Sequence, residues 1–178
     1  MRTKPIQDKS ARYQKSTFYE QLIEHAFISE LLQEGWFRFG KIIEVLRSEV
    51  DSSGYDLVLE CNDVIRHVEL KTSGLESRRS SQKVNMALAQ KPSGCVVWII
   101  REEDESKNRM DLKYLFFGSP PGKPLPSIEN LKLAKQTRGD SHGIKKLRPA
   151  MRKVPKSKFY KVSGIDELLE KLFGLSAT

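Results

Sequence analysis

The chain has 178 residues, and its 31 Lys and Arg against 23 Asp and Glu give a formal net charge of +8. This length and composition fit one domain with its own buried core, and they exclude a fully disordered chain. The longest apolar run (Cys95–Ile100) is too short to cross a membrane, Met1–Ser10 lacks the apolar stretch of a secretory signal, and only two cysteines occur, so we expect a reduced, cytoplasmic protein.

The first part of the chain predicts a basic flexible tail over residues 1–15 and then an amphipathic helix. Ser16 or Thr17 can cap this helix, which should run to about Gln33 and stop at Gly35. Its apolar face at 3.6-residue spacing holds Tyr19, Leu22, Ile23, Ala26, Phe27 and Leu31. Trp36–Leu46 then predicts a strand with a bend at Gly40, and Asp51–Tyr55 a turn.

The middle of the chain predicts strands around one basic helix. The expected elements are strands over Asp56–Cys61 and Val64–Thr72, a basic helix over Ser77–Gln90, a strand buried on both faces over Cys95–Arg101, a charged loop over Glu102–Arg109 and a strand over Leu112–Phe117. A stiff loop follows over Ser119–Pro126.

The last part predicts a short helix over Ser127–Lys135, a basic segment, and a helix that a capping box at Ser163–Asp166 opens and Phe173 ends. Helices that flank a small sheet with one hairpin indicate an α/β fold of mixed strand direction. We expect a single domain: a tail over 1–15, a core over 16–126, and a basic segment with a C-terminal helix packed on the core over 127–178.

Positive charge is concentrated in one segment. From Lys132 to Lys161 there are eleven Lys and Arg and one acid, Asp140, so this segment carries +10 and the remaining residues carry −2 of the total. We expect it to contact nucleic-acid phosphates, with a solvated surface segment as the alternative. The candidate contacts are Lys145, Lys146, Arg148, Arg152 and Lys153, together with Arg78, Arg79, Gln82 and Lys83 of the predicted basic helix.

The predicted hairpin around Asn62-Asp63 carries candidate chemistry. A two-residue loop pairs residues whose numbers sum to 125, which places Asp56 opposite Glu69. One face then collects Leu57, Leu59, Cys61, Val68 and Leu70 with Arg66, and the other, expected to be wet, collects Asp56, Glu60, His67, Glu69 and Lys71.

Two carboxylates this close repel each other unless a cation lies between them. Mg²⁺, with Mn²⁺ as a substitute, prefers such oxygen ligands and can activate water for attack on a phosphodiester. Lys71 can orient that water or stabilise the charge that develops. The alternative is a solvated ladder of ion pairs on a strand.

Three acid-x-Lys triplets occur: Glu69-Leu-Lys71, Glu105-Ser-Lys107 and Asp111-Leu-Lys113. Only the first follows, at hairpin distance, an Asp that closes a Gly-containing turn. Gly54-Tyr-Asp56-Leu-Val-Leu-Glu60 and Val68-Glu69-Leu-Lys71-Thr-Ser together resemble the core of the PD-(D/E)xK nuclease superfamily, over about residues 18–100. This superfamily includes restriction endonucleases and archaeal Holliday-junction resolvases.

The resemblance implies a restriction endonuclease-like mixed sheet flanked by helices, and a Mg²⁺-dependent endonuclease that hydrolyses DNA. It implies that Asp56 and Glu69 bind the metal and that Lys71 assists the attacking water. The family's Pro is replaced by Tyr55. A non-catalytic nucleic-acid-binding accessory or regulatory protein of the same fold is the alternative function. DNA is the expected partner, no membrane contact is expected, and a homodimer is plausible by analogy.

Family members often add an acid from the first helix. Resolvase-like members place that Glu before apolar residues at +3, +4 and +7 and a Gly at +11, and Glu24 fits through Phe27, Ile28, Leu31 and Gly35. Glu20 and Glu30 stay as alternatives, whereas Glu34 is expected to be a solvated end residue.

Overall fold

The computed structural model describes residues 16–49, 53–104, 106–136 and 144–176. The predicted tail over 1–15, Glu105 and Asp140 lie outside these ranges. In chain order the elements are α2 (Ser16–Phe37), β1 (Glu44–Arg47), β2 (Leu57–Cys61), β3 (Val64–Gly74), β4 (Ser81–Asn85), α3 (Met86–Ala89), β5 (Gly94–Asp104), β6 (Arg109–Gly118), β7 (Leu133–Lys135), β8 (Leu147–Pro155), the 3₁₀ turn Lys156–Lys158, β9 (Tyr160–Lys161) and α4 (Ile165–Phe173).

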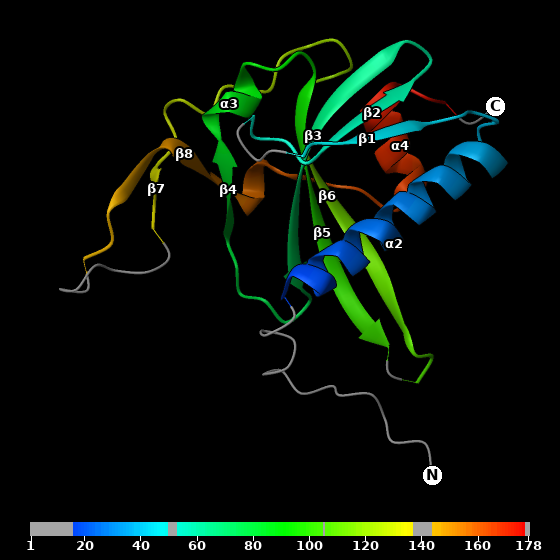
Figure 1. Cartoon of the computed structure of the whole chain (residues 1–178), viewed down its shortest axis with the longest axis horizontal. Coiled ribbons are helices and arrows are strands. Elements are labelled where there is room, and N and C mark those ends of the chain that lie inside the picture. Colours follow the sequence, from blue (N-terminus) through cyan, green and yellow to red (C-terminus); the bar gives the residue numbers. More distant parts are fainter. Residues whose placement is uncertain (1–15, 50–52, 105, 137–143, 177–178) are drawn as a thin grey trace.

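The described strands form two sheets (Figure 1). The main sheet has six strands in the order β1-β2-β3-β5-β6-β9, and the second has three in the order β4-β8-β7. Within the main sheet β3 and β5 are parallel, and the other neighbours are antiparallel. The α/β prediction with mixed strand direction is therefore confirmed.

Helix α2 is longer than predicted because Gly35 does not end it. Ile23, Phe27, Leu31 and Gly35 are buried at four-residue spacing, whereas Leu22 is exposed. A Cβ on Gly35 would lie 2.6 Å from Cδ1 of Ile43, so glycine lets the two segments approach closely. The chain leaves the helix at Gly40, whose φ of +61° is in the left-handed region. The N–H of the next residue, Lys41, donates to Gly35 O. The predicted strand over Trp36–Leu46 is thus reduced to β1.

The predicted hairpin is confirmed in its register. The pairs run from Leu57 opposite Val68 to Cys61 opposite Val64, so their numbers sum to 125. Asn62 and Asp63 have φ of 48° and 63°, the left-handed pair that a two-residue turn requires. Arg66, on the apolar face, is completely buried.

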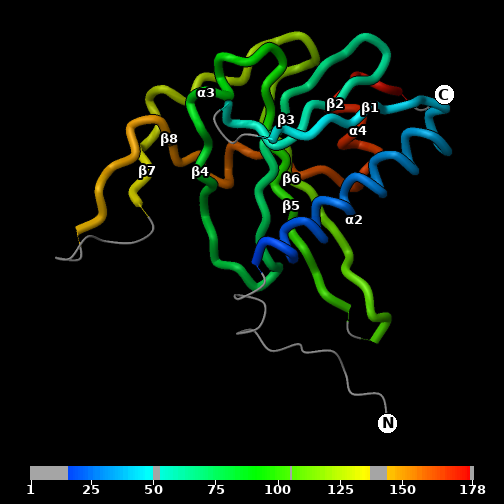
Figure 2. Tube along the Cα trace, in the orientation of Figure 1, coloured from blue at the N-terminus to red at the C-terminus, as the bar shows by residue number. Residues whose placement is uncertain are grey.

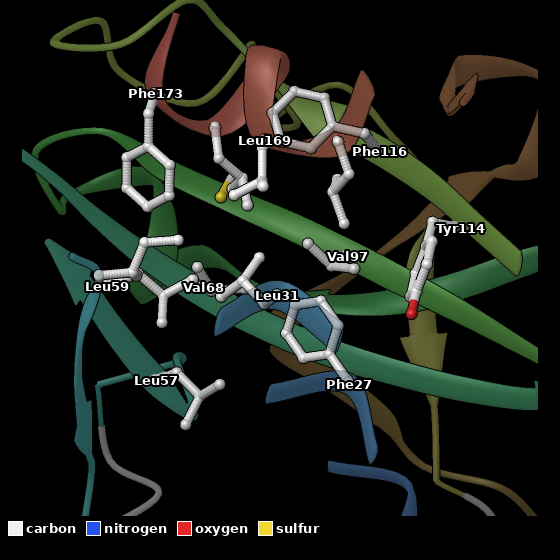
Figure 3. Close-up of a cluster of buried hydrophobic side chains, with 14 of the residues drawn as sticks. Phe27, Leu31, Leu57, Leu59, Val68, Val97, Tyr114, Phe116, Leu169 and Phe173 are labelled. Atoms are coloured by element: carbon white, nitrogen blue, oxygen red, sulfur yellow. The ribbon is translucent and has the colours of Figure 1, made fainter. Parts of the chain in front are cut away.

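Strand β5 is buried on both faces over its apolar part, as the unbroken apolar sequence predicts, and its residues belong to two cores. Figure 2 shows the trace of β5 between β4 and α2. One core lies between the main sheet, α2 and α4, where Val97 meets Phe27, Leu31 and Phe116 (Figure 3). The other lies under β4, α3 and β8, and Val96 and Trp98 point into it.

Two predicted helices are wrong. Ser77–Gln90 forms β4 and one turn of helix, because Gln82 and Val84 alternate inward and the strand pairs with β8. Ser127–Lys135 forms a turn and then β7, which pairs with the other edge of β8.

The bounds of other elements also differ from the prediction. The predicted loop Glu102–Arg109 is strand at both of its ends, because β5 extends to Asp104 and β6 begins at Arg109. At α4, Ser163 donates its N–H and O–H to Oε2 of Glu167 at 2.7 and 2.9 Å, so Glu167 and not Asp166 closes the box. None of the helices in the described ranges has the length and apolar composition to span a bilayer.

Candidate active site

The candidate site lies where β2 and β3 separate. Asp56 immediately precedes β2, and its N–H donates to Val68 O at 2.9 Å, which extends the hairpin by one residue. Strand β3 continues to Gly74, so beyond Val68 its backbone has no strand neighbour on the β2 side. The Asp56 carboxylate takes that place, since its Oδ2 accepts the N–H of Leu70 at 2.6 Å. This bond fixes the carboxylate at the point of separation.

Glu69 and Lys71 follow on the same side of β3, as the alternation predicts. Nζ of Lys71 lies 2.6 Å from Oε1 of Glu69. The expectation of a wet face is wrong for Glu69, which is only 5% exposed. The junction of β4 and α3 lies close to it, and the backbone N–H of Asn85 donates to its carboxylate.

Burial sets the charge state of this carboxyl group. It raises the pKa of Glu69 from 4.5 to about 7; the ammonium of Lys71 lowers it and the charge of Asp56 raises it. Oε2 of Glu69 has no hydrogen-bond partner among the described residues. A buried, unpartnered carboxylate oxygen beside a second acid is the arrangement that a bound cation stabilises.

A cavity of about 420 Å³ opens beside these residues. Asp56 and Lys71 lie in its wall, and α2 provides the facing wall. The other polar lining residues are Thr17, Glu20, Gln21, Glu24, Thr72, Arg79 and Gln82.

The structure separates the acids of the first helix. Glu20 and Glu24 both line the cavity, and Oε1 of Glu24 is bound by Nε of Arg47 at 2.7 Å. Glu30 points elsewhere, because its Oε2 accepts the hydroxyl of buried Tyr114 at 2.5 Å. Glu34 pairs with Arg38 on the same helix. The geometry is thus compatible with Glu24 or Glu20 and not with Glu30.

Gln82 is a member of the site that the sequence placed incorrectly. On a basic helix it was expected to face phosphates, but on β4 it points inward, is 4% exposed and lines the cavity. Its Nε2 has no hydrogen-bond partner among the described residues. The signal that could have located it is the alternation of Gln82 and Val84 with charged or polar neighbours.

The predicted nucleic-acid contacts divide into different environments. Arg79 lines the cavity, Arg78 is exposed in the loop before β4, and Lys83 lies on β4. On the β8 side, Lys145, Lys146, Arg148 and Lys153 are exposed. Arg152 instead donates to Glu129 O at 3.1 Å and to Pro149 O at 2.5 Å, so it holds backbone within the second sheet.

A metal at this site would have few protein ligands. Within the described ranges no group of three or more His, Cys, Asp or Glu is placed to hold an ion. Mg²⁺ nevertheless commonly uses one or two carboxylates and completes its shell with water and phosphate oxygens. Asp56 and the unpartnered Oε2 of Glu69 fit that donor set.

Comparisons with family models, curated proteins and solved structures find nothing that matches this chain. The assignment of a function therefore depends on the residues of the site.

Proposed function

We propose that this chain is a metal-dependent endonuclease of restriction endonuclease-like fold that hydrolyses DNA phosphodiester bonds. The observation that carries the proposal is the position of Asp56, Glu69 and Lys71 where β2 and β3 separate, next to a polar cavity. The mixed main sheet, with β2 and β3 antiparallel and β3 and β5 parallel, supports the mixed sheet that the sequence resemblance implies.

Each residue has a distinct task in this proposal. Asp56 and Glu69 would hold Mg²⁺ or Mn²⁺, which supplies polarisation of a phosphoryl oxygen. Lys71, already in the cavity wall, would stabilise the negative charge that develops on the phosphate. The amide N–H of Gln82 would donate to a phosphate oxygen, and Glu24 would orient groups from the opposite wall.

The buried environment favours a cation over bulk solvent as the partner of Glu69. Even with the ammonium of Lys71 beside it, ionising this buried group costs free energy, and its pKa rises to about 7. A solvated ladder of ion pairs would not bury one of its carboxylates.

A cleavage assay tests the proposal. Supercoiled plasmid, linear duplex, branched junction and single-stranded DNA, with RNA for comparison, should be incubated with Mg²⁺, Mn²⁺, Ca²⁺ or EDTA. We expect cleavage with Mg²⁺ and Mn²⁺ and none with Ca²⁺ or EDTA, because Ca²⁺ is larger and adopts looser geometry. Asp56→Ala should be inactive.

Asp111→Ala is the matched control, since Asp111 begins an acid-x-Lys triplet whose carboxylate pairs with Arg109 at 3.1 Å on β6. Activity that survives Asp56→Ala would contradict the proposed site. Metal-independent DNA binding with no cleavage of any substrate would favour the accessory or regulatory alternative.

A further inference from the structure

Two lysines lie on the outer face of the second sheet. Lys83 on β4 and Lys153 on β8 are directly paired, so their side chains leave the sheet on the same side. Their neighbours Gln82 and Val154 are also paired and are buried, which fixes the opposite side as the inner one. The lysines therefore face outward.

More cations gather around Lys83. Burial lowers the pKa of Lys83, and the charges of Arg148, Lys153, Lys145 and Arg79 lower it further. We call these five residues the basic face. Within the described ranges, no ion pair joins a carboxylate to Arg79, Lys145, Arg148 or Lys153, whereas the ion pairs that do form lie on other elements.

Three residues of the basic face, Lys145, Arg148 and Lys153, lie on or next to β8, in an arm that projects from the body. Strands β7 and β8 extend away from the main sheet at the left of Figure 1, and residues 144–150 are all exposed. Arg152 ties this arm to its base through Glu129 O. A projecting ribbon of two or three strands has the dimensions that enter or follow a groove of duplex DNA.

Arg79 connects the basic face to the candidate site. It lines the same cavity as Asp56 and Lys71, and its charge acts on Lys83. Arg79 is thus the residue of the basic face that also lies in the cavity wall.

We propose that the basic face binds the sugar-phosphate backbone of duplex DNA and leads one strand past Arg79 into the cavity that holds Asp56 and Lys71. The binding part stands on the charge and shape of the arm, and the delivery part rests on the proposed nuclease function. The substrate is accordingly an extended duplex and not a small phosphate ester.

The partner class follows from the charges. Arg79, Lys145, Arg148 and Lys153 form no ion pair with a carboxylate in the described ranges, and a dense row of phosphates would compensate their charge. Ile144 and Leu147 are exposed large apolar side chains on the same arm and could insert into lipid, so retention on lipid vesicles without affinity for DNA is the outcome that would favour a membrane surface.

The test separates binding from cleavage. Fluorescence anisotropy with a short labelled duplex, in EDTA and at several salt concentrations, should compare Asp56→Ala with the same protein carrying Arg79→Gln, Lys145→Gln, Arg148→Gln and Lys153→Gln. Each lost phosphate contact flattens the log–log salt dependence by about 0.9, so the slope should fall by roughly 3 to 4.

A charge-matched control removes four exposed lysines on other elements: Lys113→Gln, Lys123→Gln, Lys158→Gln and Lys161→Gln. It should keep the slope within about 1 of the parent. Circular dichroism and thermal unfolding check the fold. If the fourfold variant unfolds, the single variants Arg79→Gln and Lys153→Gln show whether the salt slope falls.

Equal slopes for parent and basic-face variant would overturn the proposal, as would retention on phosphatidylserine vesicles with no affinity for DNA. In the catalytically intact protein, the three changes outside the cavity, Lys145→Gln, Arg148→Gln and Lys153→Gln, should raise KM for a duplex more than they lower kcat. Loss of DNA affinity in a protein that cleaves nothing would support the binding surface and contradict only the nuclease assignment.

Discussion

Nζ of Lys71 and Oε1 of Glu69 lie 2.6 Å apart, two residues from each other on the same side of β3. Their surroundings differ, because Lys71 reaches the cavity wall whereas Glu69 is buried beneath it. One charged group of the pair is therefore accessible to a ligand, and the other keeps one oxygen without a protein partner in the described ranges.

The raised pKa of Glu69 predicts a pH-dependent stability. Between 4.5 and about 7 the folded chain binds more protons at this group than the unfolded chain does, so the free energy of unfolding falls as pH rises through this window. Glu69→Gln removes the titration. At about pH 8 its stability should exceed that of the wild type by up to the order of 3 kcal/mol, from roughly 1.4 kcal/mol per pKa unit.

Urea unfolding of both proteins between about pH 4 and 8 measures this difference. Added Mg²⁺ should stabilise the wild type at the upper end and leave Glu69→Gln unaffected, because a cation favours the carboxylate. Parallel pH profiles, with no effect of Mg²⁺ on either protein, would contradict both the burial argument and the metal site.

Lys71→Ala should lower the rate of DNA cleavage by at least about 100-fold, because it removes a charge expected to stabilise the transition state. Lys113→Ala is the control: Lys113 also ends an acid-x-Lys triplet, but its Nζ pairs with Oε2 of Glu102 at 2.6 Å on an exposed hairpin. Single-turnover rates at saturating DNA give the comparison. Similar rates for the two variants would remove Lys71 from the mechanism.

Gln82→Met tests the buried amide. Because Nε2 of Gln82 has no described partner, replacement by an apolar side chain of similar size should raise the free energy of unfolding by about 1–3 kcal/mol. The same change should slow cleavage, since the phosphate loses a donor. A variant that is less stable and fully active would show that the amide serves packing only.

Glu24→Gln should affect the rate of cleavage, and Glu30→Gln should affect the stability of the fold. The first removes a carboxylate from the cavity wall and should slow cleavage with little change in melting temperature. The second weakens the hydrogen bond from buried Tyr114 and should cost roughly 1 kcal/mol of stability with unchanged cleavage. Glu20→Gln, measured alongside, decides between the two acids of the cavity, and an active Glu24→Gln with an inactive Glu20→Gln would transfer the role.

Gly54→Ala should disturb the approach to Asp56. The φ of Gly54 is +75°, and a Cβ there would lie 2.9 Å from Cβ of Asn85, whose backbone N–H binds Glu69. Gly122→Ala is the matched control, because its φ is +76° and it has open space around it. Both should lose roughly 1–2 kcal/mol to backbone strain, but Gly54→Ala should lose more and should also slow cleavage. Equal stability losses and equal cleavage rates would show that this close approach does not matter.

The sequence predicts the hairpin well because its information is local. Asn62-Asp63 fixes the turn, and the alternation of apolar and charged residues fixes the register, so the positions of Asp56 and Glu69 follow. The buried strand β5 is equally visible in its apolar run.

The second sheet is not predictable in this way, because its strands find their partners far along the chain. Ser81–Asn85 is basic and polar and has no local turn to pair it, and its partner β8 begins only at Leu147. For the same reason the burial of Glu69 is missed, since the cover comes from Asn85 and not from the hairpin itself.

Strand β4 connects two surfaces through the alternation of its side chains. Gln82 faces the cavity and the next residue, Lys83, faces outward beside Lys153. An insertion of one residue within β4 would exchange these directions. The Lys83 side chain would then point into the wall of the cavity, and the Gln82 side chain would point outward. The same insertion in the exposed loop over residues 75–80 leaves both directions unchanged. The alternation of side chains within β4 therefore makes the wall of the cavity and the outer face of the second sheet depend on the length of one strand.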